Sequence, residues 1–297
     1  MSTDPSRVLV VYKKSAYQLH VVERRDRRLR CLLRAHHQEA RDLLAAHQVH
    51  QRTLEAVIRA VRDLGMRFDV VYREELRSAT RYDLVVSVGG DGTLLQASHL
   101  VDGTPVVGVN SDPSRSEAVF CAATRRTVSS ILRHAIEGRL DGLALTRLQV
   151  KLNGRLLKPF VLNDVLIAHD NPATMSRYHL KIGVRREDQK SSGLWVATAA
   201  GSSSAILAAG GRRLAWDAKR FQYRPRELYE GRLHRYHLTG GILPLSAAVE
   251  VTWLMREGAA FIDGPHVRHP LRFGDRLKVE VARHHPLIVL GARGPHR

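Results

Sequence analysis

The residues best suited to chemistry lie where an apolar run ends in three glycines that surround one carboxylate. The apolar run covers residues 84–88, and the sequence Gly-Gly-Asp-Gly-Thr follows at residues 89–93. Glycine permits close approach of the backbone, so these amides can face a phosphate chain at the start of a helix predicted over residues 93–101. In phosphoryl transfer a carboxylate can orient a metal ion or accept the proton of an attacking hydroxyl. The pattern predicts a phosphate site with Asp91 as the catalytic residue, although Asp91 or Thr93 could also simply cap the helix.

Two later motifs also combine polar groups with close backbone approach. Asn163 and Asp164 lie within an apolar run at residues 160–168, where burying them is costly unless both are satisfied. An amide beside a carboxylate suits the vicinal hydroxyls of a ribose, and a bulge or turn held by the same side chains is the structural alternative. Residues 190–211 are rich in small and hydroxylated residues, so a base or a pyrophosphate could approach the backbone there. A serine-capped, tightly packed helix would show the same composition.

The elements that must position these motifs divide the chain into an α/β part and a β-rich part. Up to about residue 140, apolar strands alternate with amphipathic helices, which predicts a mostly parallel sheet covered on both faces. We therefore predict an α/β domain over residues 1–142 and a β-rich domain over residues 143–297, whose C-terminal tail can return to the first domain. The first part has predicted strands at 7–12, 68–72, 83–88 and 105–110, and predicted helices within 23–50 and at 51–65. The second part has predicted strands at 146–152, 160–168, 179–184, 194–198, 247–253, 260–262 and 277–281.

Composition limits the class of protein and its partners. The chain has 297 residues, 44% of them hydrophobic and 26% charged, which is enough to bury a sizeable core. Its net charge of +18 would attract any polyanion, but the basic residues are spread along the chain and no RNA-recognition motif is visible. The two cysteines, Cys31 and Cys121, provide neither a disulfide framework nor a zinc site. With no apolar signal core and no run of 18 apolar residues, we predict a cytoplasmic protein without stable membrane association or nucleic-acid binding.

Taken together, the order and spacing of the motifs resemble the NAD kinase family over roughly residues 83–290. The family pattern has Gly-Gly-Asp-Gly-Thr, then Asn-Glu in a strand, then a Thr-Pro-Thr-Gly-Ser-Thr-Ala-Tyr loop that ends in Ala-Gly-Gly. Here the second motif is Asn163-Asp164, and the third is Thr-Ala-Ala-Gly-Ser-Ser-Ser-Ala at residues 198–205. The segments at 108–117 and 189–194 look most like the mitochondrial-type branch, in which a serine, here Ser192, replaces the aspartate of most bacterial members.

The resemblance implies transfer of the ATP γ-phosphoryl group to the 2′-hydroxyl of the adenosine ribose of NAD, which yields NADP. It implies that Asp91 activates that hydroxyl or positions Mg²⁺ carried by ATP, that polyphosphate is a possible donor, and that the protein forms a homodimer or homotetramer. It also assigns roles to further residues. The phosphate cradle would comprise the backbone of Gly89, Gly90, Gly92 and Thr93. The acceptor nucleotide would be held by Asn163 and Asp164, with Ser203 and Ser204 on its adenine side, and Ser192 would be a further phosphate- or nucleotide-binding residue.

Departures from the family pattern keep alternatives open. Asp164 is one methylene shorter than the usual glutamate, and Ala205 replaces a tyrosine expected to stack on a base. Ala208 stands where a serine is common. The alternatives are a lipid or other small-molecule kinase that shares the phosphate loop, and a catalytically weak nucleotide-binding regulator. The sequence does not distinguish NAD from NADH as the acceptor.

Overall fold

The computed structural model describes residues 7–229, 231, 235–292 and 294, and it divides the chain into two compact units. One unit comprises the N-terminal part up to Leu143 together with the returning segment from Ile288, and the other comprises Ala144–Leu287. None of the described helices is long and apolar enough to cross a membrane. The two units are built from different kinds of sheet, as the composition of the two halves predicts.

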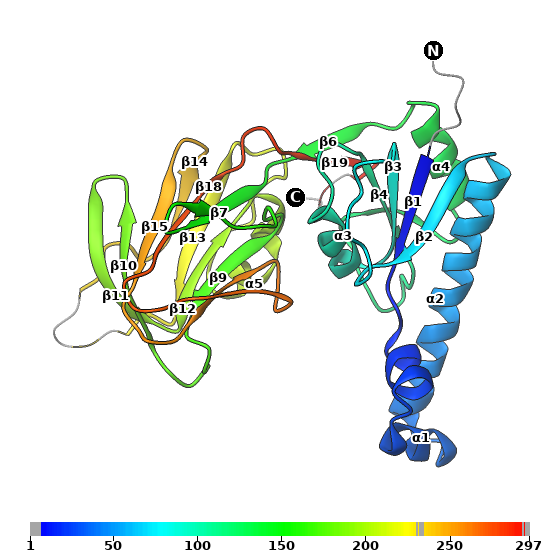
Figure 1. Ribbon diagram of the computed structural model, residues 1–297, viewed down its shortest axis with the longest axis horizontal. Helices are drawn as coiled ribbons and strands as arrows, with labels where there is room; N and C mark the ends of the chain where they lie inside the picture. Colours follow the sequence, from blue (N-terminus) through cyan, green and yellow to red (C-terminus); the bar gives the residue numbers. More distant parts are fainter. Residues whose placement is uncertain (1–6, 230, 232–234, 293, 295–297) are drawn as a thin grey trace. The chain divides into compact units, whose positions relative to one another are not determined.

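The first unit is organised around a sheet whose central strands are buried on both faces (Figure 1). Strand β1 pairs in parallel with β2 and β3, and β3 pairs in parallel with β4. Near-continuous apolar runs such as Val-Leu-Val-Val in β1 are typical of strands covered on both faces. The strand order is β2 (Arg67–Tyr72), β1 (Arg7–Tyr12), β3 (Leu84–Gly89), β4 (Val106–Asn110), β19 (Leu287–Leu290) and β6 (Gly142–Leu145), with β5 (Cys121–Thr124) also pairing with β4.

Helices cover both faces of this sheet. The buried faces of α2 and α4 share one apolar cluster with alternate residues of β1, β3 and β4, while α3 packs on the opposite face (Figure 1). The helices are the π-helix η1 (Tyr17–Glu23), α1 (Arg27–Arg34), α2 (Gln38–Asp63), α3 (Asp91–Ser98) and α4 (Val128–Ile136). The prediction of a helix boundary near residue 50 is wrong, because no glycine or proline interrupts α2 there and its apolar stripe continues to Val61. Helix α3 also begins two residues earlier than predicted and ends at Ser98.

The second unit contains two six-stranded antiparallel sheets that enclose a single apolar cluster. One sheet has the order β11 (Arg185–Ser191), β10 (Ser176–Ile182), β15 (Ala248–Trp253), β18 (Arg276–Val281), β7 (Leu148–Leu152) and β8 (Arg155–Leu156). The other has the order β14 (Gly241–Pro244), β13 (Arg220–Arg226), β12 (Gly193–Ala197), β9 (Asp164–Ala168), β16 (Ala259–Ile262) and β17 (Val267–Pro270). Two short helices, η2 (Ala200–Ser203) and α5 (Ala205–Ala208), follow β12.

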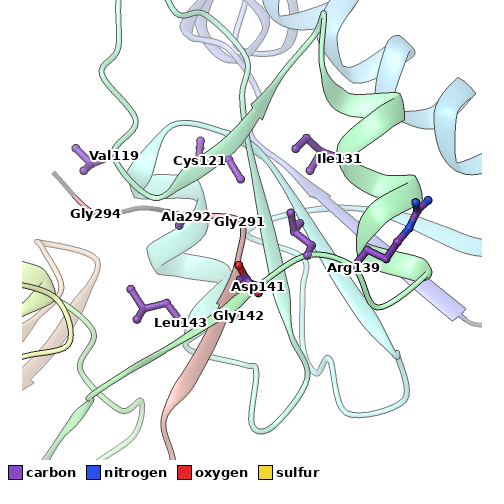
Figure 2. A pocket seen from close by; sticks show the side chains of 12 residues that line it. Val119, Cys121, Ile131, Arg139, Asp141, Gly142, Leu143, Gly291, Ala292 and Gly294 are labelled. Carbon is purple, nitrogen blue, oxygen red and sulfur yellow. The ribbon is translucent and has the colours of Figure 1, made fainter. Parts of the chain in front are cut away.

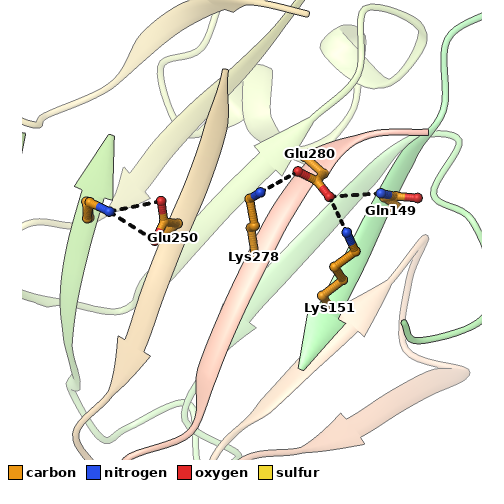
Figure 3. A network of polar contacts seen from close by, with 6 residues as sticks. Gln149, Lys151, Glu250, Lys278 and Glu280 are labelled. Atoms are coloured by element: carbon orange, nitrogen blue, oxygen red, sulfur yellow. Dashed lines mark hydrogen bonds and ion pairs between the residues drawn. The ribbon is translucent and has the colours of Figure 1, made fainter. Parts of the chain in front are cut away.

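The outward face of the first of these sheets is polar because successive side chains of a strand alternate between its two faces. Glu280 of β18 lies 2.9 Å from Gln149 Nε2, 2.8 Å from Lys151 Nζ and 2.7 Å from Lys278 Nζ (Figure 3). Burial raises the pKa of Glu280, but the hydrogen bonds from Lys151, Lys278 and Gln149 outweigh it and lower the pKa to about 2. Cross-strand ion pairs therefore stabilise this face, and apolar residues fill the interior.

Candidate active site

The glycine turn joins β3 to α3, as the sequence predicts. Gly89 is the last residue of β3, Gly90 caps α3, and Asp91 is in its first turn. A Cβ atom on Gly89 would overlap the side chain of Thr93, and one on Gly90 would lie 3.0 Å from Ser116 Oγ. These two glycines thus allow close packing, whereas a Cβ on Gly92 would meet nothing within 4 Å. The amide of Thr93 donates to the carbonyl oxygen of Gly90 at 3.0 Å, so the amides of Asp91 and Gly92 are the ones that precede the first hydrogen bond of α3. Amides at such a helix start are suited to an anion.

A cavity of ≈ 220 Å³ opens beside this turn, within the first unit. Gly89 and Gly90 form part of its wall, together with Lys13 and Arg115. Arg115 Nη1 lies 3.1 Å from Asp112 Oδ2, and hydrogen bonds from Ser114 and Arg115 lower the pKa of Asp112 despite its burial. Burial, and next the positive charge of Arg73, lower the pKa of Lys13. Two cations and two glycines in one small cavity suit a phosphate group.

Helix α2 holds the two loops that form the cavity wall. His50 is 2% exposed, and its Nε2 lies 2.7 Å from the carbonyl oxygen of Lys13. One turn later, Thr53 Oγ1 donates to the carbonyl oxygen of Ser111 at 3.1 Å. Burial, and next the charge of Lys13, lower the pKa of His50 to about 4, so the neutral ring donates from Nε2. His50 was not predicted as a site residue, because a histidine within an amphipathic helix carries no distinctive signal.

The carboxylate of Asp91 is held by the backbone of a distant loop rather than by the cavity. Its Oδ2 accepts from the amide of Val119 and its Oδ1 from the amide of Phe120, both at 2.9 Å. Burial raises the pKa of Asp91 although both of these hydrogen bonds lower it. Asp91 is not part of the cavity wall that contains Lys13 and Arg115. Asp91 is thus the first residue of α3, and its carboxylate anchors the loop before β5.

The loop that Asp91 holds leads into a fork in the sheet. Strand β4 pairs with β19 at Val106 and with β5 from Gly108 onward, so β5 and β19 diverge. A second cavity of ≈ 720 Å³ occupies the fork, with Val119 and Cys121 on one side and Gly291 on the other (Figure 2). Asp141 lies in its wall, and burial raises the pKa of the Cys121 thiol to about 12. The amides that hold Asp91 therefore belong to a segment that borders this open space.

In the second unit, Asn163 and Asp164 lie at the start of β9 rather than inside a longer strand, which corrects the predicted strand at 160–168. Asp263, in a left-handed conformation with φ of 50°, holds this start. Its Oδ1 accepts from the amides of Asn163 at 2.7 Å and Asp164 at 3.1 Å, and its Oδ2 accepts from the amide of Leu162 at 2.9 Å. The sequence Phe-Ile-Asp-Gly at 261–264 supports the family resemblance, but the positioning role of Asp263 was not predicted.

The small-residue loop packs directly on Asn163. Thr198 donates from its amide to the carbonyl oxygen of Asn163 at 2.9 Å and from Oγ1 to that of Leu162 at 2.5 Å. A Cβ on Gly201 would overlap the carbonyl group of Asn163, so this position requires glycine. The side-chain oxygen of Asn163 is buried and has no hydrogen-bond partner. Asn163, on which the loop packs, thus presents an unsatisfied acceptor next to Asp164.

Asp164 is 6% exposed, and Ser204 Oγ lies 2.6 Å from its Oδ2 and also 2.6 Å from the carbonyl oxygen of Gly201. Burial raises the pKa of Asp164 to about 6, the charge of Asp263 raises it too, and the Ser204 hydrogen bond opposes the shift. This carboxyl group can therefore gain or lose a proton near neutral pH.

The structure brings some of the predicted site residues together and leaves others apart. Asn163, Asp164 and Ser204 form one cluster, and Ser203 ends η2 directly before Ser204. Ser192 precedes β12, whereas Asp164 pairs with Ala197 at the other end of that strand. Ala205 is exposed at the start of α5. Because the residue is alanine, it provides no aromatic ring beside the cluster. Among the described residues no group of three or more His, Cys, Asp or Glu side chains is arranged to hold a metal ion.

A mostly parallel sheet with a glycine-bounded cavity, followed in the chain by an antiparallel sandwich, is the arrangement expected of the predicted nucleotide-dependent phosphotransferase. Residues 8–139 match the family model described as the ATP-NAD kinase N-terminal domain. The chain is 35% identical over 255 residues to the probable NADH kinase of Oryza sativa subsp. japonica, with 78% of each chain covered. It is 32% identical over 199 residues to NAD kinase 2, mitochondrial, of Rattus norvegicus, with 63% of this chain and 46% of that protein covered.

Among solved structures, that of an NAD kinase from Archaeoglobus fulgidus in complex with ATP is similar in fold. Its TM-score is 0.68 at 18% sequence identity, with 97% of this chain and 94% of that chain covered. The chain belongs to the NAD kinase family. Family membership confirms the predicted fold class and removes the lipid-kinase alternative.

Proposed function

We propose that this protein transfers the γ-phosphoryl group of ATP to the adenosine-ribose 2′-hydroxyl of NADH or NAD. The observation that carries this proposal is the cavity in which Gly89 and Gly90 lie beside Lys13 and Arg115. Glycine backbone and two cations can bind phosphate oxygens from two sides. The name of the rice relative favours NADH as the acceptor, whereas the sequence motifs alone left NAD and NADH equivalent.

The chain's own residues divide the task as follows. Lys13 and Arg115 bind phosphates, His50 and Thr53 fix the loops that bear the cavity wall, and Asp91 fixes the loop before β5. For Asp91 to act as the general base that the motif predicts, one of its oxygens must accept from the acceptor hydroxyl through a lone pair that the amides of Val119 and Phe120 do not use. Burial, which raises the pKa of Asp91, would make it a better proton acceptor once that contact forms.

The acceptor nucleotide is assigned to the cluster in the second unit. The unpartnered side-chain oxygen of Asn163 can accept from a ribose hydroxyl, and Asp164 can do the same when ionised. Ser203 and Ser204 are proposed to contact the adenine side, and Ser192 stays a prediction. Ala205 offers no stacking surface, so we expect Ala205→Tyr to lower the KM for the acceptor.

Mg²⁺ fits this chain as an ion that enters with ATP. Magnesium prefers one or two carboxylates plus substrate phosphates, and the described residues contain no protein cage for it. Asp91, in the glycine turn, and Asp112, in the wall of the cavity beside it, could contribute a ligand. When bound, the ion would neutralise charge on the phosphates being transferred. The homo-oligomeric state and the cytoplasmic setting stay predictions.

The proposal is tested with purified protein, Mg²⁺ and either NADH or NAD, with ATP or polyphosphate as the donor. We expect NADPH to form from NADH and ATP at a rate at least equal to that of NADP from NAD. Formation from polyphosphate alone would extend the donor range that the +18 charge suggests. Tight nucleotide binding without either product would instead support the regulator that the Asp164 and Ala205 departures allow.

A further inference from the structure

A cavity of ≈ 480 Å³ in the second unit takes no part in the proposed reaction. It lies where three strands of the sandwich begin or end. Lys219 directly precedes β13, Leu245 and Ser246 follow β14, and Arg283 lies shortly after β18. None of the lining residues belongs to the Asn163–Asp164 cluster. The volume is in the range of small-molecule sites.

The charge of its wall distinguishes this cavity from those of the first unit. The cavity at the glycine turn contains Asp112, and the cavity of Figure 2 contains Asp141. The present wall contains Lys219 and Arg283 and no carboxylate. Within the described part of the chain, no ion pair engages either of these two cations. The electrostatic match is to a small anion, and the guanidinium geometry of Arg283 suits phosphate.

The rest of the wall indicates more than inorganic phosphate. Hydroxyl groups of Thr146 and Ser246 can donate to anion oxygens or accept from a ligand hydroxyl. Leu245, Val281 and Pro286 provide an apolar side, which a ring or short hydrocarbon would cover. A phosphate monoester with an apolar body satisfies both parts of the wall.

Two of the segments that line the cavity are tied together before any ligand arrives. Arg147 is 1% exposed; its carbonyl oxygen accepts from the amide of Ala282 at 2.9 Å, and its Nε donates to the carbonyl oxygen of His285 at 2.5 Å. The ring of His285 stacks on Phe160, with 4.3 Å between ring centroids. Arg147 thus ties the segment after β6 to the segment after β18, and both segments line the cavity. A preformed wall reduces the entropy lost on binding.

We propose that this cavity binds a small phosphate monoester, held by Lys219 just before β13 and by Arg283 in the segment through which the chain leaves the second unit. The site is separate from the substrate sites of the proposed kinase reaction. Binding would add a bridge from the segment before β13 to the segment after β18, which Arg147 already joins to the segment after β6.

Pyridoxal 5′-phosphate provides a direct test, because it is an aromatic phosphate monoester whose aldehyde forms an imine with a nearby lysine. After borohydride reduction, peptide mapping of the full-length protein would compare labelling of Lys219 with that of Lys181, which is 46% exposed on an outer sheet face. We expect preferential labelling of Lys219 and protection by inorganic phosphate. Labelling of the two lysines at equal rates, without phosphate protection, would overturn the proposal.

Two arginine variants and two nucleotides sharpen the test. Arg283→Gln should weaken labelling of Lys219 by about tenfold, the loss of one charge-assisted hydrogen bond, whereas Arg186→Gln on the exposed part of β11 should not. Circular dichroism would confirm that both variants fold.

Protection of Lys219 by ATP or NADH at concentrations near their KM, but not by phosphate, would place this lysine in the substrate site and contradict a separate phosphate site. The labelling readout does not depend on kinase activity, so it can fail or succeed apart from the proposed function.

Discussion

The two carboxylates at the predicted site residues show how differently one chain can hold the same functional group. Asp91, in the first unit, bonds through both oxygens to the backbone amides of Val119 and Phe120. Asp164, in the second unit, has one serine hydroxyl as a partner and stands near a second carboxylate, Asp263. Backbone amides cannot rotate away, so Asp91 is fixed in place, whereas the environment of Asp164 raises its pKa to about 6. The first carboxylate is set up to organise a loop and the second to change protonation.

The largest expected effect is on Asp91. Asp91→Asn removes the base and one acceptor, so we expect kcat to fall roughly 10²–10⁴-fold. One buried amide of residues 119–120 would lose its acceptor, which costs about 1–3 kcal/mol of unfolding free energy. Steady-state kinetics and urea unfolding should be measured on the same preparation. Asp141→Asn, in the wall of the neighbouring cavity, is the matched control and should change neither quantity; an unchanged kcat in Asp91→Asn would remove the catalytic role.

Adding a methyl group at Gly201 and at Gly92 should change the free energy of unfolding by different amounts. Gly201→Ala places a methyl group into the backbone of Asn163 and should cost about 3 kcal/mol, because a carbonyl group cannot move aside. Gly92→Ala has open space around its Cβ and should leave the unfolding free energy within about 0.5 kcal/mol. Thermal or urea unfolding checks both values. Equal losses in the two variants would contradict the packing described for Gly201.

The raised pKa of Asp164 predicts a pH dependence with a defined sign. Folding raises this pKa from 3.8 to about 6, so the folded state binds the proton more tightly than the unfolded state. The stability contributed by Asp164 is complete below pH 3.8 and is lost as pH rises through about 6, by at most about 3 kcal/mol. Urea unfolding between pH 4 and pH 8 should show this slope in wild type and a smaller one in Asp164→Asn. Asp188→Asn is the control: if it reduced the pH dependence of the unfolding free energy as much as Asp164→Asn does, that pH dependence could not be assigned to Asp164.

The smallest expected effect tests how Asp263 supports Asp164. Asp263→Asn keeps the shape and tolerates the left-handed backbone, but it removes the negative charge near Asp164. We expect a loss of about 1–2 kcal/mol from weaker bonds to three amides, together with a lower pKa of Asp164. NMR titration of the carboxyl group would report the pKa directly. An unchanged or higher value would show that Asp263 does not influence Asp164.

Much of the architecture follows from local sequence. A short apolar run that ends at a glycine turn, such as residues 84–88, is typical of a strand covered on both faces, which the structure confirms as β3. The alternation in residues 247–253 likewise predicts a strand with one polar face, which the structure confirms as β15. Strands β11 and β17 were not predicted, because charged residues dominate β11, β17 is only four residues long, and each is held mainly by pairing with a neighbour.

For the candidate site, too, some features could be predicted from the sequence and others could not. The residue types at 89–93 and 163–164 indicated phosphate and ribose sites, and the resemblance of the ordered motifs, including residues 198–205, predicted the family to which the chain belongs. The partners of those groups could not be predicted. His50 reaches Lys13 across 37 residues, Asp91 reaches Phe120 across 29, and Asp263 reaches Asn163 across 100. Sequence fixes which groups are present, whereas only the tertiary structure decides which amides, hydroxyls and charges surround them and therefore which carboxylate is fixed and which one titrates.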